Sequence, residues 1–410
     1  MKIMHLSATS SGGAGIAAKR IVEAVNTYTD ADAYLLTHKE FGTVPDCSAP
    51  PFFFRVKGKI ESIVLSCCRT DNHIFHSLGM FGSGLVDFIN HSDADIVHLH
   101  WINDQFLSIR DIAKIKKKII WTQHDSWAFC GAEHHPDIVR GDKRFQEGYS
   151  SDNLLSGSRG IDLDKLIFLW KKYCWKDQKF NFSAPSIWEA DLLKKSYLFH
   201  SCDCAVIPNC VNTDCFVPQD KTAARKKWDL PFDRPVILFG AVSLQDKNKG
   251  SQYLLEAVKK LNKSIPDFLL VCFGKGDMEI FTEQGIDCIT VGSVHKDEQL
   301  SSLYNAADVF VCPSIVENLP NTCVEASACG IPVSAFRTGG IPDVVQHQET
   351  GFLASPFDTG ELAEGIGYCL AHKDTLGAEA RKHVLKNFSM PVAGEKFYKL
   401  YEQILQESAG

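Results

Sequence analysis

Two glutamates near residue 320 carry the strongest chemical signal in this 410-residue sequence. Glu317 follows the apolar run 308–314, which predicts a buried strand ending in a turn, and Glu325 lies about one turn inside the helix predicted to begin near Pro320 or Asn321. The first amides of that helix lack partners within it and favour an anion. Because a carboxylate accepts several hydrogen bonds, the two acids suit the ribose and sugar hydroxyls of a nucleotide sugar, with the amides on its diphosphate. The alternative is that neither acid binds a ligand: one would be an acid favoured by the helix dipole at a helix N-terminus, and the other a solvated glutamate.

Two further segments place phosphate-binding chemistry between a predicted strand and a helix. Lys249 follows the apolar run 236–240, and its ammonium group can meet a diphosphate as a point charge, although a surface lysine is the alternative. Gly12 and Gly13 connect the apolar run 2–6 to a helix predicted over 16–25, where backbone amides can approach a phosphate. Their spacing is not the dinucleotide fingerprint, and a tight turn is equally compatible with it.

The histidines and cysteines predict no metal site. His98 and His100 lie along one predicted strand, and we expect them on opposite faces, where they would not share a metal ion. His134 and His135 are expected at the surface of a long loop over 132–164. The fifteen cysteines lack the spacing of a zinc site, and we expect small buried thiols in a reducing compartment.

The elements around these residues alternate between short apolar runs and amphipathic stretches, which predicts an α/β fold with parallel sheets. We expect two Rossmann-like domains that face each other across a cleft. The N-terminal domain would span 1–212 and the C-terminal domain 213–387, with a helix over 388–406 returning to the first. The net charge of -7 argues against a nucleic-acid partner. No secretory signal or membrane span is predicted, so the expected location is the cytoplasm.

The stretch 292–352 resembles the donor-binding half of the retaining family 4 glycosyltransferases, which have the GT-B fold. The matching pieces are 303–309, Pro313 with Ser314, Glu317 with Glu325, 328–333, 339–343 and 351–353. Weaker similarities are Lys249-Gly250 and the segment 122–127, which contains His124, Asp125 and Trp127. One departure is Ala241, which stands where the family commonly has an arginine. The other is 130–135, which stands where the family often has a Cys- and Gly-rich segment.

The resemblance implies a role for each matching residue. Glu325 would hold the donor ribose, Glu317 would face the sugar hydroxyls and Lys249 the diphosphate. His124 would approach the reacting carbon, with Asp125 and Trp127 on the acceptor side. The implied catalytic residues are thus His124, Glu317 and Lys249. The implied donor-binding set is Gly12, Gly13, Lys249, Gly274, Asn318, Leu319, Pro320, Asn321, Thr322 and Glu325.

The function implied by the resemblance is a retaining, metal-independent hexosyltransferase without a cofactor, which uses a UDP- or GDP-sugar as donor substrate. Its acceptor would be a glycan, with a lipid-linked oligosaccharide of bacterial surface polysaccharide or O-antigen (lipopolysaccharide) assembly at the inner face of the membrane as the leading candidate. The basic and aromatic stretch 165–179 would contact an anionic membrane, or would be a solvated helix whose apolar residues face the core. The alternatives are a nucleotide-sugar epimerase or hydrolase and a non-catalytic nucleotide-sugar-binding subunit.

Overall fold

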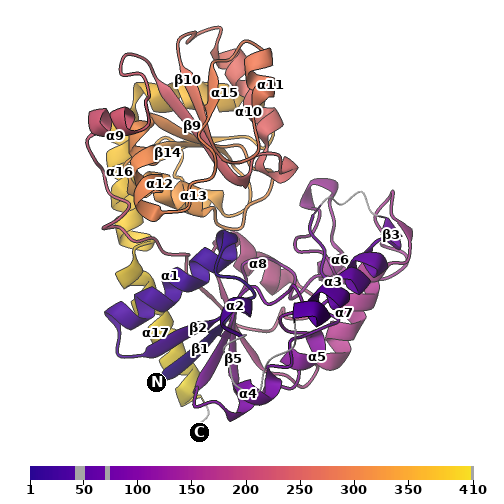
Figure 1. Cartoon of the computed structure of the whole chain (residues 1–410). Helices are drawn as coiled ribbons and strands as arrows, with labels where there is room; N and C mark the ends of the chain where they lie inside the picture. The colour runs from indigo at the N-terminus through magenta and orange to yellow at the C-terminus, as the bar shows by residue number, and fades with distance from the viewer. Residues whose placement is uncertain (42–50, 70–73, 408–410) are drawn as a thin grey trace. The chain divides into compact units, whose positions relative to one another are not determined.

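The computed structural model describes residues 1–41, 51–69 and 74–407 (Figure 1). The chain divides into two compact units: the N-terminal unit, Met1–Ile207 with Gly394–Gly410, and the C-terminal unit, Pro208–Ala393. Helix α17 (Met390–Gln406) therefore begins in one unit and ends in the other. Each unit is built on its own parallel sheet, so the predicted α/β architecture with two Rossmann-like halves is confirmed.

The N-terminal unit contains a six-stranded sheet with the order β2-β1-β4-β5-β7-β8, in which every pair is parallel. Its strands are β1 (Lys2–Leu6), β2 (Asp32–Leu36), β4 (Ile96–Leu99), β5 (Lys118–Thr122), β7 (Phe180–Ala184) and β8 (Cys204–Val206). The strand order reverses between β1 and β4. In open parallel sheets, such a switch point opens a crevice at the carboxyl ends of the strands.

Helices cover this sheet, and shorter elements extend from it. The helices are α1 (Gly12–Tyr28), α2 (His38–Phe41), α3 (Pro51–Leu65), α4 (Val86–His91), α5 (Ile109–Ile112), α6 (Arg144–Glu147), α7 (Leu163–Cys174) and α8 (Ile187–Lys195), with a 3-10 turn at Ile138–Arg140. Strands β3 (Cys68–Arg69) and β6 (Arg159–Gly160) form a separate antiparallel pair. Helix α1 begins at Gly12, earlier than predicted, because both glycines join its first turn.

The C-terminal unit has a second parallel sheet, with the order β11-β10-β9-β12-β13-β14. Its strands are β9 (Val236–Ser243), β10 (Leu269–Lys275), β11 (Cys288–Thr290), β12 (Val309–Cys312), β13 (Val333–Phe336) and β14 (Gly351–Ala354). Its helices are α9 (Lys221–Lys227), α10 (Ser251–Leu261), α11 (Glu279–Glu283), α12 (Asp297–Ala306), α13 (Asn321–Ala328), α14 (Ile341–Val344), α15 (Thr359–Ala371) and α16 (Lys373–Asn387). The switch point lies between β9 and β12.

The apolar runs of the C-terminal unit are continuous because both faces of its sheet are covered. Along β9, Val236 and Leu238 pack into one core cluster, while Ile237 and Phe239 pack into the other. Side chains alternate between the faces of a strand, so a sheet covered on both sides needs apolar residues at every position. This burial explains why the strands could be located from composition alone.

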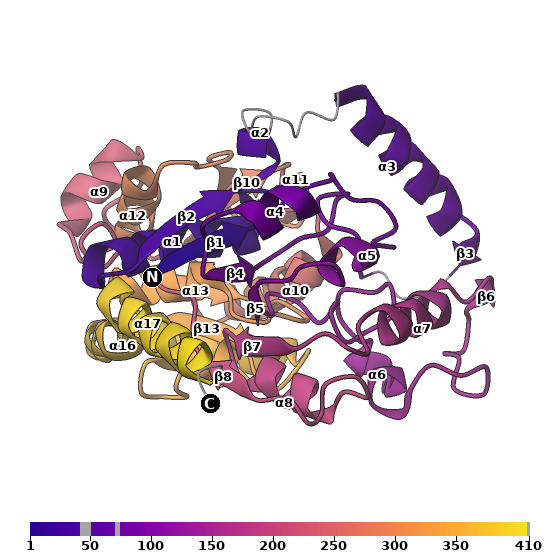
Figure 2. The same cartoon turned by 90° about the horizontal axis from the view of Figure 1, so that it is seen from below.

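Helix α17, the yellow helix labelled in Figure 2, packs its side chains into the N-terminal unit. Its side chains Phe397 and Tyr401 are fully buried, and the ammonium group of Lys118 donates to the carbonyl oxygen of Ile404 at 2.6 Å. Within the described part of the chain, no helix is both long and apolar enough to cross a membrane.

Candidate functional site

Two loops meet at the switch point of the C-terminal sheet. A 3-10 turn, Lys247–Lys249, follows β9, and the loop 313–320 follows β12. Lys249 Nζ lies 2.6 Å from Glu317 Oε1, and the Ser314 hydroxyl donates to the same carboxylate oxygen at 3.0 Å. The predicted lysine and the first predicted glutamate are therefore paired, at the position where open parallel sheets bind ligands.

The backbone holds the two loops in close contact. Gly250 has a φ of +72°, and a Cβ there would come within 1.8 Å of the carbonyl oxygen of Pro313. The Ile315 amide donates to the carbonyl oxygen of Asn248 at 2.9 Å. Only glycine fits this left-handed turn at such a close approach, so the sequence Lys249-Gly250 fixes the lysine opposite the loop that carries Glu317.

The electrostatics of the pair keep the lysine charged. Burial alone would lower the pKa of Lys249, but the adjacent Glu317 carboxylate outweighs it and raises the pKa to about 12. The Lys249 side chain remains 32% exposed and that of Glu317 15%. An anionic ligand can therefore reach a permanent cation, and binding it would exchange or share the contact that Glu317 now makes.

Helix α13 supplies the second predicted glutamate and starts at Asn321, as predicted. Glu325 is 4% exposed, and the buried Tyr304 hydroxyl donates to its Oε2 at 3.0 Å. In the segment that leads into the helix, Asn318, Leu319 and Pro320 are buried and Asn321 and Thr322 are half-buried. The tyrosine therefore fixes one carboxylate oxygen of Glu325.

Two other predicted positions of this unit lie on adjacent strands. Gly274 lies in β10, and its amide donates to the carbonyl oxygen of Gly292 at 2.9 Å. That amide is therefore already engaged within the sheet region. Ala241, the departure from the family resemblance noted in the sequence, is 7% exposed near the end of β9. Its methyl group supplies no charge, so Lys249 is the cation that the structure places beside Glu317.

The remaining predicted residues belong to the N-terminal unit. Gly12 and Gly13 open α1, and His124, Asp125 and Trp127 follow β5. His124 and Asp125 are half-buried. His124 Nε2 lies 2.9 Å from His100 Nδ1, across the loops that follow β5 and β4.

Asp125 is held by a histidine that was expected at the surface. His134 is only 4% exposed, and its Nδ1 lies 2.6 Å from Asp125 Oδ2, while its Nε2 lies 2.9 Å from the Ser77 hydroxyl. The surface prediction was wrong because the loop folds back, with the Ser126 amide donating to the His134 carbonyl oxygen at 2.8 Å. Burial would raise the pKa of Asp125, but His134 reverses this and the pKa is lowered to about 2.

Trp127 lies in the core. It is 1% exposed, its indole NH donates to the carbonyl oxygen of Ser77 at 2.8 Å, and the ammonium of Lys171 lies 3.7 Å from its ring centre. Lys171 is fully buried and also donates to the carbonyl oxygens of Cys130 and Gly131, at 3.2 and 2.7 Å. Trp127 thus has little surface for a ligand, and Lys171, which the sequence did not single out, fixes the backbone beyond Asp125.

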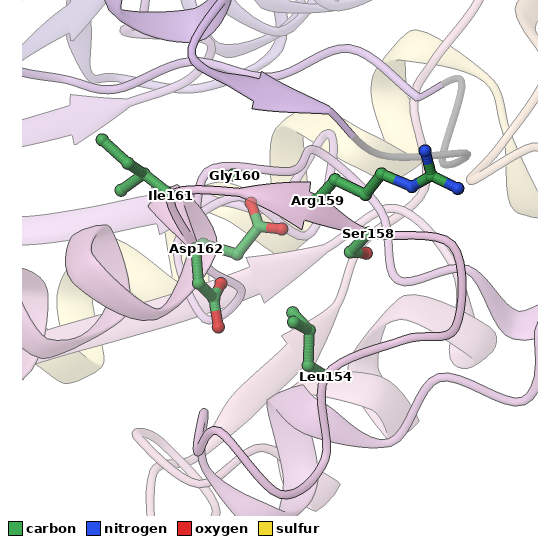
Figure 3. A pocket seen from close by; sticks show the side chains of 7 residues that line it. Leu154, Ser158, Arg159, Gly160, Ile161 and Asp162 are labelled. Carbon is green, nitrogen blue, oxygen red and sulfur yellow. The ribbon is translucent and has the colours of Figure 1, made fainter.

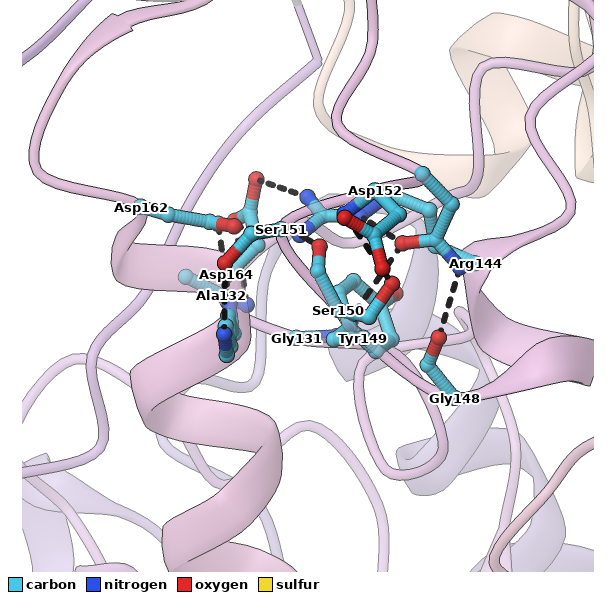
Figure 4. A network of polar contacts seen from close by, with 12 residues as sticks. Gly131, Ala132, Arg144, Gly148, Tyr149, Ser150, Ser151, Asp152, Asp162 and Asp164 are labelled. Atoms are coloured by element: carbon cyan, nitrogen blue, oxygen red, sulfur yellow. Dashed lines mark hydrogen bonds and ion pairs between the residues drawn. The ribbon is translucent and has the colours of Figure 1, made fainter.

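The predicted long loop is ordered by the polar network of Figure 4. The Gly131 amide donates to the Tyr149 hydroxyl at 2.9 Å, and the Ala132 amide donates to Asp164 Oδ1 at 3.3 Å. The buried Arg144 forms an ion pair with Asp162, and its guanidinium lies 4.5 Å from the centre of the Tyr149 ring. These contacts hold the segment over 131–164, which contains only short elements (the 3-10 turn, α6 and β6) before α7 begins.

A small pocket opens beside β6, away from the predicted residues (Figure 3). Its lining consists of Leu154, Ser158, Arg159, Gly160, Ile161, Asp162 and Asp164. None of these was predicted to bind donor or acceptor, and the pocket shares its aspartates with the network of Arg144.

The expectation that His98 and His100 lie on opposite faces was wrong. Side chains alternate with a period of two residues, so positions two apart share a face. The two rings stack with their centres 4.3 Å apart, and both are fully buried. Together with His5 they form a cluster whose ring nitrogens lie within 4.8 Å of one another.

Comparison with solved structures shows that the two halves have the GT-B fold. Sucrose-phosphate synthase from Thermosynechococcus elongatus superposes with a TM-score of 0.67 at 19% identity, covering 99% of each chain. Anabaena HepE in complex with UDP-glucose gives a TM-score of 0.64 at 16% identity, covering 98% of this chain and 100% of the other. At these identities the similarity establishes the fold.

The sequence comparison finds a similarity for one segment. Residues 234–372 match the family described as glycosyl transferases group 1, and Lys249, Glu317 and Glu325 lie within the matched segment. The chain is 31% identical over 53% of its length to D-inositol 3-phosphate glycosyltransferase from Corynebacterium jeikeium. It is 30% identical over 47% of its length to a GDP-mannose-dependent alpha-(1-6)-phosphatidylinositol monomannoside mannosyltransferase from Mycolicibacterium smegmatis. The matches span 55% of each of these relatives, or about half their length.

Proposed function

We propose that the protein is a glycosyltransferase that moves a hexose from a nucleotide diphosphate sugar to a hydroxyl group of an acceptor. The observation that carries this proposal is the pair of Lys249 and Glu317 at 2.6 Å, at the switch point of a group 1 glycosyltransferase domain. A cation and a carboxylate side by side suit a donor that presents a diphosphate next to a polyhydroxylated ring.

Transfer breaks the anomeric bond and leaves negative charge on the departing diphosphate. Lys249 and the first amides of α13 would stabilise that charge, which is usually the largest electrostatic contribution to such a reaction. Glu325 would bind the ribose and Glu317 the sugar hydroxyls. In this scheme Lys249 supplies the positive charge that a metal ion supplies in metal-dependent enzymes. The acceptor hydroxyl attacks the anomeric carbon from the face that the diphosphate leaves, so the anomeric configuration is retained.

The test compares donor cleavage with and without an acceptor. We expect UDP or GDP to be released from a UDP- or GDP-sugar, and release to rise when a glycan acceptor is added. Lys249→Ala should lower the rate at least about a hundredfold. Lys259→Ala, on the exposed face of α10, is the matched control and should leave it unchanged. Wild-type rates for Lys249→Ala would refute the proposal.

The same assay separates the alternative functions. An epimerase would change the sugar, and a hydrolase would release nucleotide, without any acceptor. A non-catalytic subunit would bind nucleotide without turnover. Retention is tested by the anomeric proton coupling of the product, and metal independence by transfer in the presence of EDTA.

We propose a glycan acceptor that is linked to a lipid. Two observations favour a membrane-bound acceptor: a relative is named for phosphatidylinositol monomannoside, and α7 exposes an apolar stripe. The stripe consists of Leu166, Leu169 and Tyr173, which are 52%, 45% and 72% exposed and share one helix face. Ile167 and Phe168 of the same helix are buried, so core packing does not use the exposed stripe.

Lysines flank this stripe, at positions 165, 172 and 176, which suits an anionic bilayer. At low salt, phosphatidylglycerol vesicles should carry the protein into the floating lipid fraction. Phosphatidylcholine vesicles should leave the protein in the soluble fraction. The double variant Leu166→Glu/Tyr173→Glu should stay in the soluble fraction, whereas Leu385→Glu, an exposed leucine of α16, should not change flotation. Soluble inositol phosphate, the other acceptor class suggested by the relatives, is tested in parallel in the transfer assay.

A further inference from the structure

A line of buried polar side chains crosses the N-terminal sheet. His5 on β1 pairs in register with His98 on β4, and Thr122 on β5 pairs with Ser183 on β7. All four side chains are essentially inaccessible to solvent among apolar strands. Polar groups buried at such a position are costly unless each finds a hydrogen-bond partner.

Each of these groups does find a partner, and the partners form one continuous chain. From one end, His124 Nε2 lies 2.9 Å from His100 Nδ1, and His100 Nε2 lies 2.9 Å from His5 Nδ1. His5 Nε2 then lies 3.4 Å from the Tyr401 hydroxyl on α17.

From Tyr401 the chain of hydrogen bonds returns through the sheet. The Tyr401 hydroxyl lies 2.8 Å from His98 Nδ1, and His98 Nε2 lies 2.7 Å from the Thr122 hydroxyl. The Thr122 hydroxyl lies 2.6 Å from that of Ser183. The order is thus His124, His100, His5, Tyr401, His98, Thr122 and Ser183.

A metal ion held by His5, His98 and His100 is the alternative use of this cluster. Ligand nitrogens would have to converge on a point about 2.0–2.1 Å from each. Instead, the rings of His98 and His100 stack at 4.3 Å and those of His5 and His100 at 5.2 Å, with interplanar angles of 26° and 14°. Both ring nitrogens of each of these histidines already face another member of the chain.

The hydrogen bonds that join His124, His100 and His5 must point the same way. Burial lowers the pKa of His5 to about 3 and that of His124 to about 4, and it lowers the pKa of His98 and His100 well below 6.5. A neutral imidazole has one donor and one acceptor nitrogen, whereas a hydroxyl has one proton to donate and can accept from both neighbours. Reversing one bond between two imidazoles would leave two acceptors or two protons facing each other, so these bonds reverse together, and the partner of His5 at Tyr401 sets their direction.

The geometry at Tyr401 selects the direction. Its hydroxyl is at 2.8 Å from His98 Nδ1 but at 3.4 Å from His5 Nε2. The phenol has one proton to donate, and we assign that proton to the shorter contact, with His98, so that the hydroxyl accepts from His5 Nε2–H at the longer one. Donation therefore runs from His124 towards Ser183.

We propose that this chain fixes the tautomer of His124, with the proton on Nε2 and with Nδ1 as a bare acceptor for a substrate hydroxyl group. His5, His98, His100 and Tyr401 are positioning residues that act through His124. The contact between His124 and a substrate rests on the proposed function, extended by the role that the family resemblance implies for His124, whereas the tautomer does not.

The test reads the tautomer by long-range proton–nitrogen NMR of the full-length protein labelled with 15N-histidine, without any substrate. We expect His124 to carry its proton on Nε2. Tyr401→Phe should shift it to Nδ1, because His5 Nε2–H loses its acceptor and the upstream bonds reverse. Thr122→Val provides an independent break at the other end. His91→Asn, on the exposed end of α4, is the control and should change nothing.

Three results would overturn the proposal: Nδ1 protonation in the wild type, an unchanged tautomer in Tyr401→Phe, or a stoichiometric metal in the purified protein. Activity supplies a separate readout. Tyr401→Phe should lower kcat for transfer about tenfold and leave KM for the donor unchanged. If the tautomer shifts and transfer does not slow, the role of His124 in the proposed function fails while the chain stands.

Discussion

A buried glutamate next to the loop that follows β5 gives a sharp test of the electrostatics described above. Glu189, in the first turn of α8, is fully buried. Its Oε1 accepts from the Ser126 hydroxyl at 2.9 Å, and its Oε2 has no hydrogen-bond partner within the described residues. Burial, reinforced by the charge of Asp125, raises the pKa of this carboxyl well above 4.5. The folded protein therefore holds a proton that the unfolded chain releases.

The direction in which stability changes with pH follows from proton binding. Above pH 4.5 the folded state binds more protons than the unfolded state, so the free energy of unfolding falls as pH rises. Each pH unit is worth about 1.4 kcal/mol while the folded carboxyl stays protonated. Glu189→Gln imitates the neutral acid, so the free energy of unfolding of the variant does not fall with pH through this residue. The two proteins should differ least near pH 5, and the advantage of the variant should grow as pH rises towards 7, by up to about 1.4 kcal/mol per pH unit for as long as the folded carboxyl stays protonated.

The assay is urea unfolding followed by tryptophan fluorescence between pH 5 and 7. Every tryptophan except Trp228 lies in the N-terminal unit, so the signal reports on the unit that contains Glu189. The exposed Glu147→Gln is the control and should give a difference that does not vary with pH. Parallel pH profiles for the wild type and Glu189→Gln would show that Glu189 is ionised when folded and would refute the reasoning.

Three further predictions address single contacts. Lys171→Met removes the donor from three carbonyl oxygens, those of Trp127, Cys130 and Gly131. It should reduce the free energy of unfolding by about 3–5 kcal/mol in urea melts, against at most about 0.5 kcal/mol for the exposed Lys172→Met. Gly250→Ala should destabilise the C-terminal unit by more than about 2 kcal/mol, detected as faster hydrogen exchange, since it meets both strain and a clash. His134→Ala should raise the pKa of Asp125 from about 2 in a carboxyl-carbon NMR titration, and an unchanged value would contradict the pairing.

Much of the fold could be predicted because its signals are local. Apolar runs such as 236–240 are strands buried on both faces, and Lys249-Gly250 marks a turn whose conformation only glycine adopts. The contact between Lys249 and Glu317 could also be expected from the sequence, since the loops that follow β9 and β12 meet at the switch point of the sheet. The roles assigned to these residues stay predictions, as does the division of domains at residue 212, which compares with a structural division after Ile207.

What the sequence did not reveal depends on contacts between distant segments. His134 is buried because its loop returns to Asp125 and Ser77, and the loop's polar composition gave no sign of that return. In the sequence, Lys171 looks like any other lysine of the basic stretch 165–179, but its side chain points into the core. The histidines were misplaced for a simpler reason, because two residues on a strand separated by one other share a face. Tyr401, which contacts both His5 and His98, lies in α17, far from them in the sequence.

The path of α17 has a consequence for biosynthesis. Tyr401 and Phe397 fill the core of the unit formed by the first 207 residues, so that unit stays incomplete until the end of the chain has been made. The intervening C-terminal unit, by contrast, is contiguous from Pro208 to Ala393 and has all its strands available earlier. On the ribosome, the half translated first would therefore reach its native packing last, and nascent chains lacking α17 would expose His5 and His98 to water.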